Sequence, residues 1–100
     1  MIFSKEYTKL KNKKFHTIRK NTGHYKPGMA VTIKTPKQKF TAWITGTSPI
    51  KKEDITGDLA LRDADCTREE LIKMLETWYG PDYDDFIMIW LERLERLGPL

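Results

Sequence analysis

The feature that most constrains the fold of this chain is a helix whose beginning and end are both marked in the sequence. Thr67-Arg68-Glu69-Glu70 is a capping box, in which the threonine hydroxyl and the Glu70 carboxylate each accept a hydrogen bond from a backbone amide at the helix start. Gly80-Pro81 ends the helix. Between these limits, apolar residues recur at the spacing of one helix face: Leu71, Met74, Leu75 and Trp78. The sequence therefore predicts an amphipathic helix over residues 67–79 with this face buried.

Short strand patterns lie on both sides of this helix. The four candidate strands are residues 14–19, 30–33, 40–45 and 86–91. The first and third alternate between two faces, as half-buried strands do, and the last is apolar on both faces, which is typical of a central strand. A short helix is expected over residues 4–11, and residues 50–65 favour an irregular or helical stretch interrupted by Gly57. This order predicts an α+β domain, built as a small β-barrel with short helices at its rim.

Length and composition favour a single domain over residues 1–100. A hydrophobic content of 39% with 11% aromatic residues argues against disorder, and nothing resembles an internal repeat. The longest apolar run, residues 86–91, is far shorter than the roughly 18 residues that a membrane helix needs. Cys66 is the only cysteine, which excludes an internal disulfide and a multi-cysteine zinc site. We therefore expect a cytoplasmic monomer or homodimer with no metal and no cofactor.

The net charge of +4 conceals two halves of opposite sign. Residues 1–52 contain twelve lysines and one arginine against the single acid Glu6, a net charge of +12, whereas residues 53–100 contain five basic and thirteen acidic residues, a net charge of −8. This asymmetry favours a basic face for a polyanion and an acidic face turned elsewhere. If the halves interleave in space, their charges mostly cancel. The partner that the basic half favours is RNA or a modified nucleoside.

The string Lys14-Phe15-His16-Thr17-Ile18-Arg19, followed by the turn Tyr25-Lys26-Pro27-Gly28 and a β-branched strand, resembles the opening of an ASCH domain. The resemblance continues through a loop of acids, a threonine-led helix and a closing apolar strand, so that it covers residues 3–91. ASCH domains are small β-barrels similar to the PUA fold, and the branch most similar to this chain contains small bacterial amidohydrolases that remove the acetyl group from N4-acetylcytidine. The resemblance implies a basic cleft that binds a nucleoside or RNA and hydrolyses an N4-acylcytidine; cleavage of RNA, as by a ribonuclease, is less favoured.

The resemblance also implies which residues carry the chemistry. It assigns catalysis to Lys14, Thr17 and one acid just ahead of the helix. Counting back from the helix puts Ala64 at the position of that acid, with Asp63 and Asp65 on either side. The candidate catalytic residues are therefore Lys14, Thr17, Asp63 and Asp65.

The residues expected to bind the substrate all lie in the basic half of the chain. They are Arg19, Tyr25, Lys26 and Trp43. A guanidinium can contact a phosphate through two hydrogen bonds, and Tyr25 and Trp43 supply rings on which a nucleobase stacks. Trp78 fits the helix face and Trp90 fits the central strand, so both are expected in the core.

Catalysis by Lys14 sets two physical requirements. A threonine hydroxyl needs a base beside it, and lysine is a base only when its pKa lies well below the ordinary value of about 10.4. Burial and neighbouring cations lower this pKa, whereas Asp63 or Asp65 nearby would keep the lysine protonated, able to polarise a carbonyl or hold a phosphate. Strict strand alternation places Lys14 and Thr17 on opposite faces, so they converge only if the chain bends at the start of the strand.

Two other functions fit the same sequence. The first is a binding module without chemistry, in which basic residues contact RNA phosphates and the affinity falls steeply with salt. The second is a protein-interaction domain whose acidic face meets a basic partner. That face would include Glu53, Asp82, Asp84 and Asp85. Taken singly, Lys14 also fits a solvated surface lysine, and Thr17 a strand residue selected for its β-branched side chain.

Overall fold

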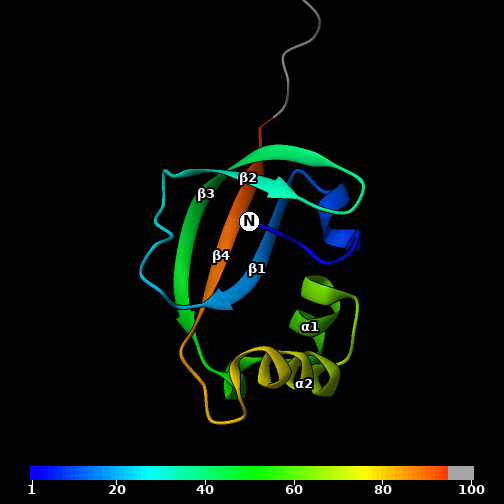
Figure 1. The fold of residues 1–100 in the computed structure, drawn as a ribbon, viewed down its shortest axis with the longest axis vertical. Helices are drawn as coiled ribbons and strands as arrows, with labels where there is room; N and C mark the ends of the chain where they lie inside the picture. Colours follow the sequence, from blue (N-terminus) through cyan, green and yellow to red (C-terminus); the bar gives the residue numbers. More distant parts are fainter. Residues whose placement is uncertain (95–100) are drawn as a thin grey trace, which may run out of the picture.

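Four strands form one antiparallel sheet in the computed structural model, which describes residues 1–94 (Figure 1). The strands are β1 (Lys14–Lys20), β2 (Ala30–Lys34), β3 (Lys39–Ile50) and β4 (Phe86–Arg93). Their order in the sheet is β1-β4-β3-β2, so the last strand of the sequence lies between β1 and β3. The expectation of a central strand at residues 86–91 is confirmed, because β4 pairs on both sides and its first four residues are all buried.

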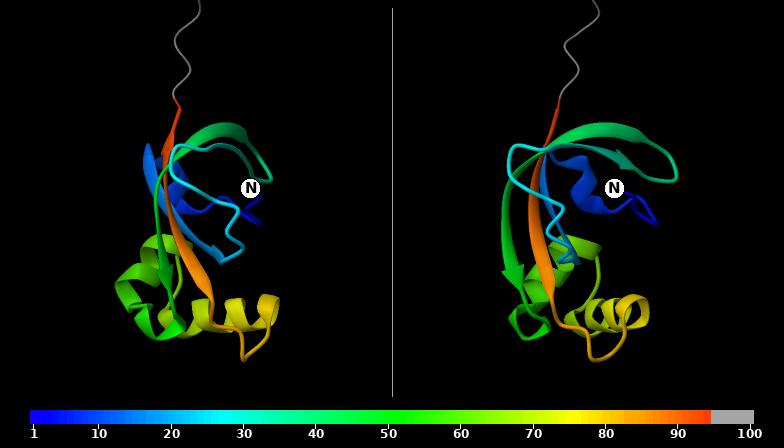
Figure 2. Two further views of the ribbon diagram at one scale, coloured as in Figure 1. Left: turned by 90° about the vertical axis from the view of Figure 1, so that its left-hand side faces the viewer. Right: turned by 60° about the vertical axis from the view of Figure 1, so that its left-hand side comes forward.

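Two α-helices gather at one end of the sheet (Figures 1 and 2). The helical elements are η1 (Thr8–Lys11) and η2 (Lys52–Asp54), both 3₁₀ helices, and α1 (Gly57–Ala64) and α2 (Arg68–Tyr79). The predicted capping box is confirmed, because the Thr67 hydroxyl accepts from the Glu70 amide and the Glu70 carboxylate accepts from the Thr67 amide, both at 3.2 Å. The α+β class and the expected order of elements are also confirmed. None of the helices within residues 1–94 is long and apolar enough to cross a membrane.

The sheet is open, in contrast to the closed barrel that the sequence predicts. β1 and β2 lie at its two edges. The N-terminal segment covers the free edge of β2 through a parallel bridge between Ile2 and Lys34, flanked by backbone hydrogen bonds of 2.9 Å. A bulge between Ile44 and Gly46 interrupts the register of β3, and a bulge bends a strand and increases its twist. Figure 2 shows the resulting curvature, with the N-terminal segment on the concave side of the sheet.

The hydrophobic core lies between the concave face of the sheet and the segments packed on it. Phe15 of β1 meets the rings of Phe3 and Phe40 edge to face, with centroids 6.5 and 6.2 Å apart. From the helical end, α2 contributes Leu71 and Leu75 to the same cluster. The predicted helix face is thus buried at Leu71 and Leu75.

Two tryptophans lie outside the core, contrary to the expectation from the sequence. Trp78 is 55% exposed and Trp90 is 40% exposed. Trp78 belongs to the last turn of α2, where the apolar face of the helix borders a cavity. Trp90 projects from the convex face of the sheet, in register with His16 and Gly46. Helical and strand periodicity identifies the face of an element but not how far its neighbours cover that face.

Candidate functional site

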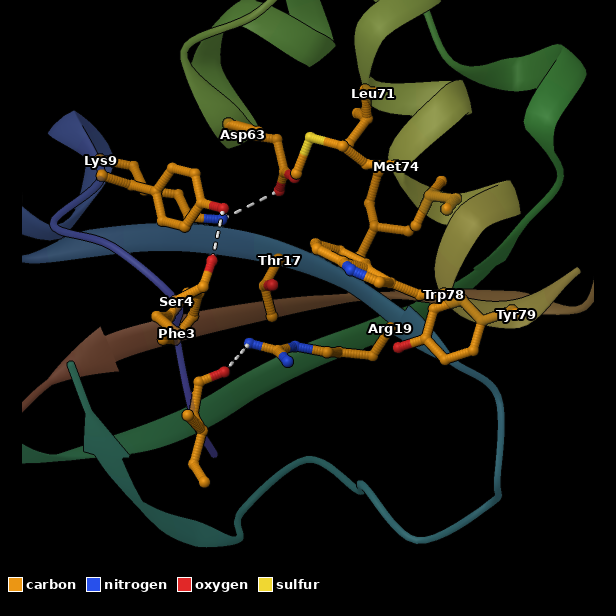
Figure 3. Close-up of a pocket in the computed structure, with 15 residues that line it drawn as sticks. Phe3, Ser4, Lys9, Thr17, Arg19, Asp63, Leu71, Met74, Trp78 and Tyr79 are labelled. Atoms are coloured by element: carbon orange, nitrogen blue, oxygen red, sulfur yellow. Dashed lines mark hydrogen bonds and ion pairs between the residues drawn. The ribbon is translucent and has the colours of Figure 1, made fainter. Parts of the chain in front are cut away.

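A cavity of about 310 Å³ opens beside β1, between the N-terminal segment and the two α-helices (Figure 3). Its polar side chains include Ser4, Tyr7, Lys9, Thr17, Arg19 and Asp63. Its apolar wall is formed by Phe3 and by the Leu71, Met74 and Trp78 side chains of α2. An apolar wall with a few convergent polar groups is the usual composition of a small-molecule site, and the volume lies at the lower end of the common range of about 300–1,000 Å³.

β1 supplies two of the polar groups because alternate residues of a strand share a face. Phe15, Thr17 and Arg19 all lie on the concave face, as predicted, with Phe15 in the core and the other two in the cavity. Thr17 is 3% exposed. Figure 3 shows it in the middle of the lining, with the side chains of Lys9 and Asp63 to one side and that of Arg19 to the other.

Lys9 and Asp63 form a buried ion pair at this cavity. Lys9 Nζ lies 3.1 Å from Asp63 Oδ1, and the two side chains are 6% and 7% exposed. The rings of Phe3 and Tyr7 lie 5.1 and 5.4 Å from the same ammonium group. Burial lowers the pKa of Lys9, and the Asp63 carboxylate opposes that shift. Lys9 therefore releases its proton more readily than an exposed lysine does.

Asp63 also contacts His16, which projects from the opposite face of β1. His16 Nδ1 lies 3.1 Å from the Oδ1 atom that contacts Lys9 Nζ. An ionised carboxylate only accepts hydrogen bonds, so the imidazole presents its Nδ1–H to Asp63. Both contacts are possible because β1 is an edge strand, and a carboxylate beside its free edge can be reached from either face. Asp63 therefore links the two sides of β1.

Arg19 carries the only buried side-chain nitrogen or oxygen without a hydrogen-bond partner in residues 1–94, its Nε atom. Its Nη2 donates to the Ile2 carbonyl at 3.0 Å, and its guanidinium lies 4.6 Å from the ring of Phe3. Burial lowers the pKa of Arg19, and the neighbouring Tyr79 and Tyr25 phenols oppose the shift. Leaving a buried donor unpaired costs about 1–3 kcal/mol. Arg19 therefore places one unpaired donor at the lining of the cavity.

The predicted catalytic residues divide between the two sides of β1. Thr17 and Asp63 line the cavity, whereas Lys14 and Asp65 are exposed and line a wider hollow on the convex side. β1 pairs with β4 without a bulge, so Lys14 and Thr17 remain on opposite faces, as strict alternation predicts. Asp65 ends α1 with a left-handed backbone (φ 56°), and its carboxylate accepts a 2.9 Å hydrogen bond from the Thr8 amide. This hydrogen bond links η1 to the end of α1.

Of the predicted binding residues, Arg19 lines the cavity and the other three do not. Tyr25 is half-buried against the core, close enough to Arg19 to influence its pKa. Lys26 is exposed in the loop between β1 and β2. Trp43 is 42% exposed and lies on the convex face of the sheet.

Lys9 is the site residue that the sequence analysis missed. It is one of twelve lysines in the first 52 residues, and lysine is almost never fully buried unless it is paired. The only available signal is indirect, because Lys9 lies between Tyr7 and Leu10, two residues expected on the inner side of a short helix. Its partner Asp63 is 54 positions away, so local sequence does not reveal the pair.

No group of three or more histidine, cysteine, aspartate or glutamate side chains in the described part of the chain is arranged to hold a metal ion. Comparison with protein-family models, with curated proteins and with solved structures finds no match to this chain.

Proposed function

We propose that the cavity binds a ribonucleoside, free or within RNA, and hydrolyses an acyl group from its base, as an N4-acylcytidine amidohydrolase does. The observation that supports this proposal is one cavity that combines the unpartnered Nε of Arg19, the hydroxyl of Thr17 and the buried Lys9–Asp63 pair. In this proposal the chain is an ASCH-type domain, and its curved sheet corresponds to the barrel of the PUA-like fold.

The two kinds of cavity lining match two properties of such a substrate. A nucleobase has flat faces, and the exposed Trp78 at the border of the cavity supplies an aromatic ring against which one can lie. Its carbonyl oxygen accepts hydrogen bonds, and Arg19 Nε is a donor in need of an acceptor.

Thr17 and Lys9 supply the reacting groups of the proposed reaction. When Lys9 has lost its own proton, it accepts the proton of the Thr17 hydroxyl while the threonine oxygen attacks the acyl carbon. The C–N bond then breaks, Lys9 returns the proton to the amino nitrogen, and cytidine leaves. Water next attacks the acyl-threonine ester, with Lys9 passing a proton from the water to the threonine oxygen, so that acetic acid is released and Thr17 is restored. Asp63 positions Lys9 throughout.

This assignment places the base at Lys9, whereas the resemblance implies Lys14. Lys9 shares the cavity with Thr17, and Lys14 lies on the other side of β1. Burial also lowers the pKa of Lys9, which favours the neutral form that a base needs. We therefore assign the base to Lys9 and test the two lysines against each other.

The test is the release of cytidine from N4-acetylcytidine by the purified protein, followed by chromatography. We expect the wild type to release cytidine. The rate should fall at least about 100-fold in Lys9→Met, because a general base typically contributes a factor of this size. Lys11→Met is the matched control, since Lys11 is an exposed lysine of the same helix η1, and it should keep the wild-type rate. Circular dichroism checks that each variant is folded.

Lys14→Met decides between the two lysines. If this variant loses activity while a folded Lys9→Met variant keeps it, the base is Lys14 and the assignment to Lys9 is wrong. If the folded wild type releases no cytidine, the proposed hydrolysis of this amide is wrong.

A nucleoside-binding or RNA-binding module without catalysis is the second candidate, and the Lys9–Asp63 contact favours it. A carboxylate 3.1 Å from Nζ stabilises the ammonium form of Lys9, which can bind a carbonyl or phosphate oxygen but cannot act as a base. Saturable binding of N4-acetylcytidine without turnover, weakened by Arg19→Gln, would identify this candidate.

A further inference from the structure

The convex face of the sheet, opposite the cavity, exposes two tryptophans on neighbouring strands. Trp43 of β3 is 42% exposed and Trp90 of β4 is 40% exposed. The register pairs Trp43 with Glu92 in one cross-strand row and places Trp90 between His16 and Gly46 in the next. Residues that pair directly across antiparallel strands lie on the same face. The two indoles therefore belong to one surface, here called the tryptophan platform.

The indole of Trp90 lies beside Gly46 of β3. A Cβ atom added at Gly46 would be 3.8 Å from Cε3 of Trp90, an ordinary van der Waals distance, so the ring packs next to this glycine. At the bulge of β3, the Thr45 hydroxyl donates a 3.3 Å hydrogen bond to the Trp90 carbonyl and helps to fix the two strands. An indole supported on one side and exposed on the other offers a face on which a flat ring can stack.

Most of the charged residues at strand positions on this face of the sheet are lysines. By register they include Lys14, Lys20, Lys34 and Lys39. Within residues 1–94, the only carboxylate at an outward strand position is that of Glu92, which lies 3.7 Å from Lys13 Nζ. This charge complements a polyanion. It also disfavours a second copy of the chain docked face to face, because like charges would meet.

We propose that the tryptophan platform binds single-stranded RNA, with unpaired bases stacked on the two indoles and phosphates beside the lysines. Unpaired bases present the faces that stack on aromatic side chains, whereas a duplex hides them. Thr32 and Thr41 form an outward-facing pair next to Trp43, and their hydroxyls suit the ribose 2′-hydroxyl. The platform and the cavity lie on opposite faces of the sheet, so this proposal does not depend on the chemistry of the cavity.

Fluorescence anisotropy of a labelled single-stranded RNA tests the platform. We expect Trp43→Ala and Trp90→Ala each to weaken binding about tenfold or more, because removing a ring from under a base has an effect of this size. Thr77→Ala is the control, since Thr77 is an exposed residue of α2 that lines neither the cavity nor the hollow beside Lys14 and His16, and it should keep the wild-type affinity.

Two further measurements distinguish stacking from a merely structural role. Trp90→Phe keeps an aromatic ring and should recover much of the affinity lost in Trp90→Ala. Lys14→Ala should reduce the slope of log affinity against log salt concentration by about 0.7, the value for one phosphate contact on a single strand.

Several results would overturn the proposal. Wild-type affinity in both Trp43→Ala and Trp90→Ala would exclude the platform, and loss of binding in Trp78→Ala alone would place the RNA at the cavity. Equal affinity for single-stranded DNA of the same sequence would exclude the assignment to RNA. A dimer that dissociates in Trp43→Ala would show that a second copy covers this face. Hydrolysis of free N4-acetylcytidine should not change in Trp43→Ala or Trp90→Ala, so the two proposals fail separately.

Discussion

Asp63 is the residue on which the electrostatics of the cavity depend most. Its Oδ1 atom lies 3.1 Å from both Lys9 Nζ and His16 Nδ1, and its side chain is almost fully buried. A buried carboxylate is tolerated only with such partners. The same contact holds η1 against α1 and influences how readily Lys9 loses its proton.

Asp63→Asn should lower the free energy of unfolding by about 3–5 kcal/mol at neutral pH, because it leaves the Lys9 ammonium buried without a counter-ion. Burial lowers the pKa of Lys9 below its ordinary value of 10.5 in the folded protein. At a pH between the folded-state pKa and the ordinary pKa, the unfolded chain therefore binds more protons than the folded protein, and stability rises with pH in that range. The cost of the substitution should therefore shrink at alkaline pH. Urea denaturation at neutral and alkaline pH measures the difference in free energy of unfolding between the wild type and Asp63→Asn. A difference that does not change with pH would contradict the role of the Lys9 charge.

The sequence predicted part of the cavity because part of it follows from local geometry. Thr17 and Arg19 are two positions apart in a strand, so alternation alone places them on one face. Asp63 was among the candidates because of its place ahead of the α2 cap, whereas Lys9 was not. Whether a lysine is buried depends on a partner from a distant part of the chain, and no pattern around Lys9 carries that information.

At the scale of elements, Glu6 closes the turn between β2 and β3. This carboxylate, the only one in the first 52 residues, accepts a hydrogen bond from the Thr35 hydroxyl and another of 2.8 Å from the Lys37 amide. Within the turn, the Thr35 amide donates to the Gln38 carbonyl at 2.9 Å. The pKa of Glu6 is lowered mainly by the hydrogen bond from the Thr35 hydroxyl, which stabilises the charged carboxylate. The N-terminal segment therefore stabilises a turn about 30 residues away.

Glu6→Gln should destabilise the protein at neutral pH and have much less effect in acid. Because the pKa of Glu6 is lowered in the folded protein, its contribution is complete above the ordinary value of 4.5 and is lost as the pH falls through the folded-state value. Thermal denaturation over an acidic pH series should show a weaker pH dependence of Tm in the variant. Parallel curves for the two proteins would rule out this role.

The elements that the sequence predicted correctly are those defined by contacts between neighbours along the chain. The capping box at Thr67 and the alternation of β1 involve only neighbours along the chain, and both were predicted. The exposure of Trp78 and Trp90 depends on what packs beside α2 and β4, and the expectation that both lie in the core was wrong. Whether the sheet closes depends on the distance between β1 and β2, which hydrophobic periodicity does not specify.

At the scale of the molecule, the two oppositely charged halves interleave in the sheet. β4, from the acidic half, pairs between β1 and β3 of the basic half. Within residues 1–94, three ion pairs of lysine with a carboxylate join the halves: Lys9–Asp63, Lys13–Glu92 and Lys52–Glu76. On the convex face the positive and negative charges cancel only in part, because Glu92 is the one acid that β4 contributes to this face.

One buried cluster joins the sheet to both helices, and this predicts a single unfolding transition. Its members include Phe15, Ile89, Ala60, Leu71 and Leu75. A small domain with one core usually unfolds cooperatively. Far-UV circular dichroism, which follows the helices, and the tryptophan fluorescence of a Trp78→Phe variant, which follows the sheet through Trp43 and Trp90, should therefore give coincident urea curves. Two separate midpoints would show that the helices unfold independently of the sheet.

The central position of β4 has a consequence during synthesis on the ribosome. Until residues 86–93 have left the exit tunnel, β1 and β3 lack the strand that pairs with both, and only the β2–β3 hairpin can form from the sheet. Pairings between distant segments form late and slowly. The nascent chain therefore exposes the apolar side chains of β1 and β3, such as Phe15 and Ile44, until β4 has left the tunnel, and chaperones have the most to protect in this interval.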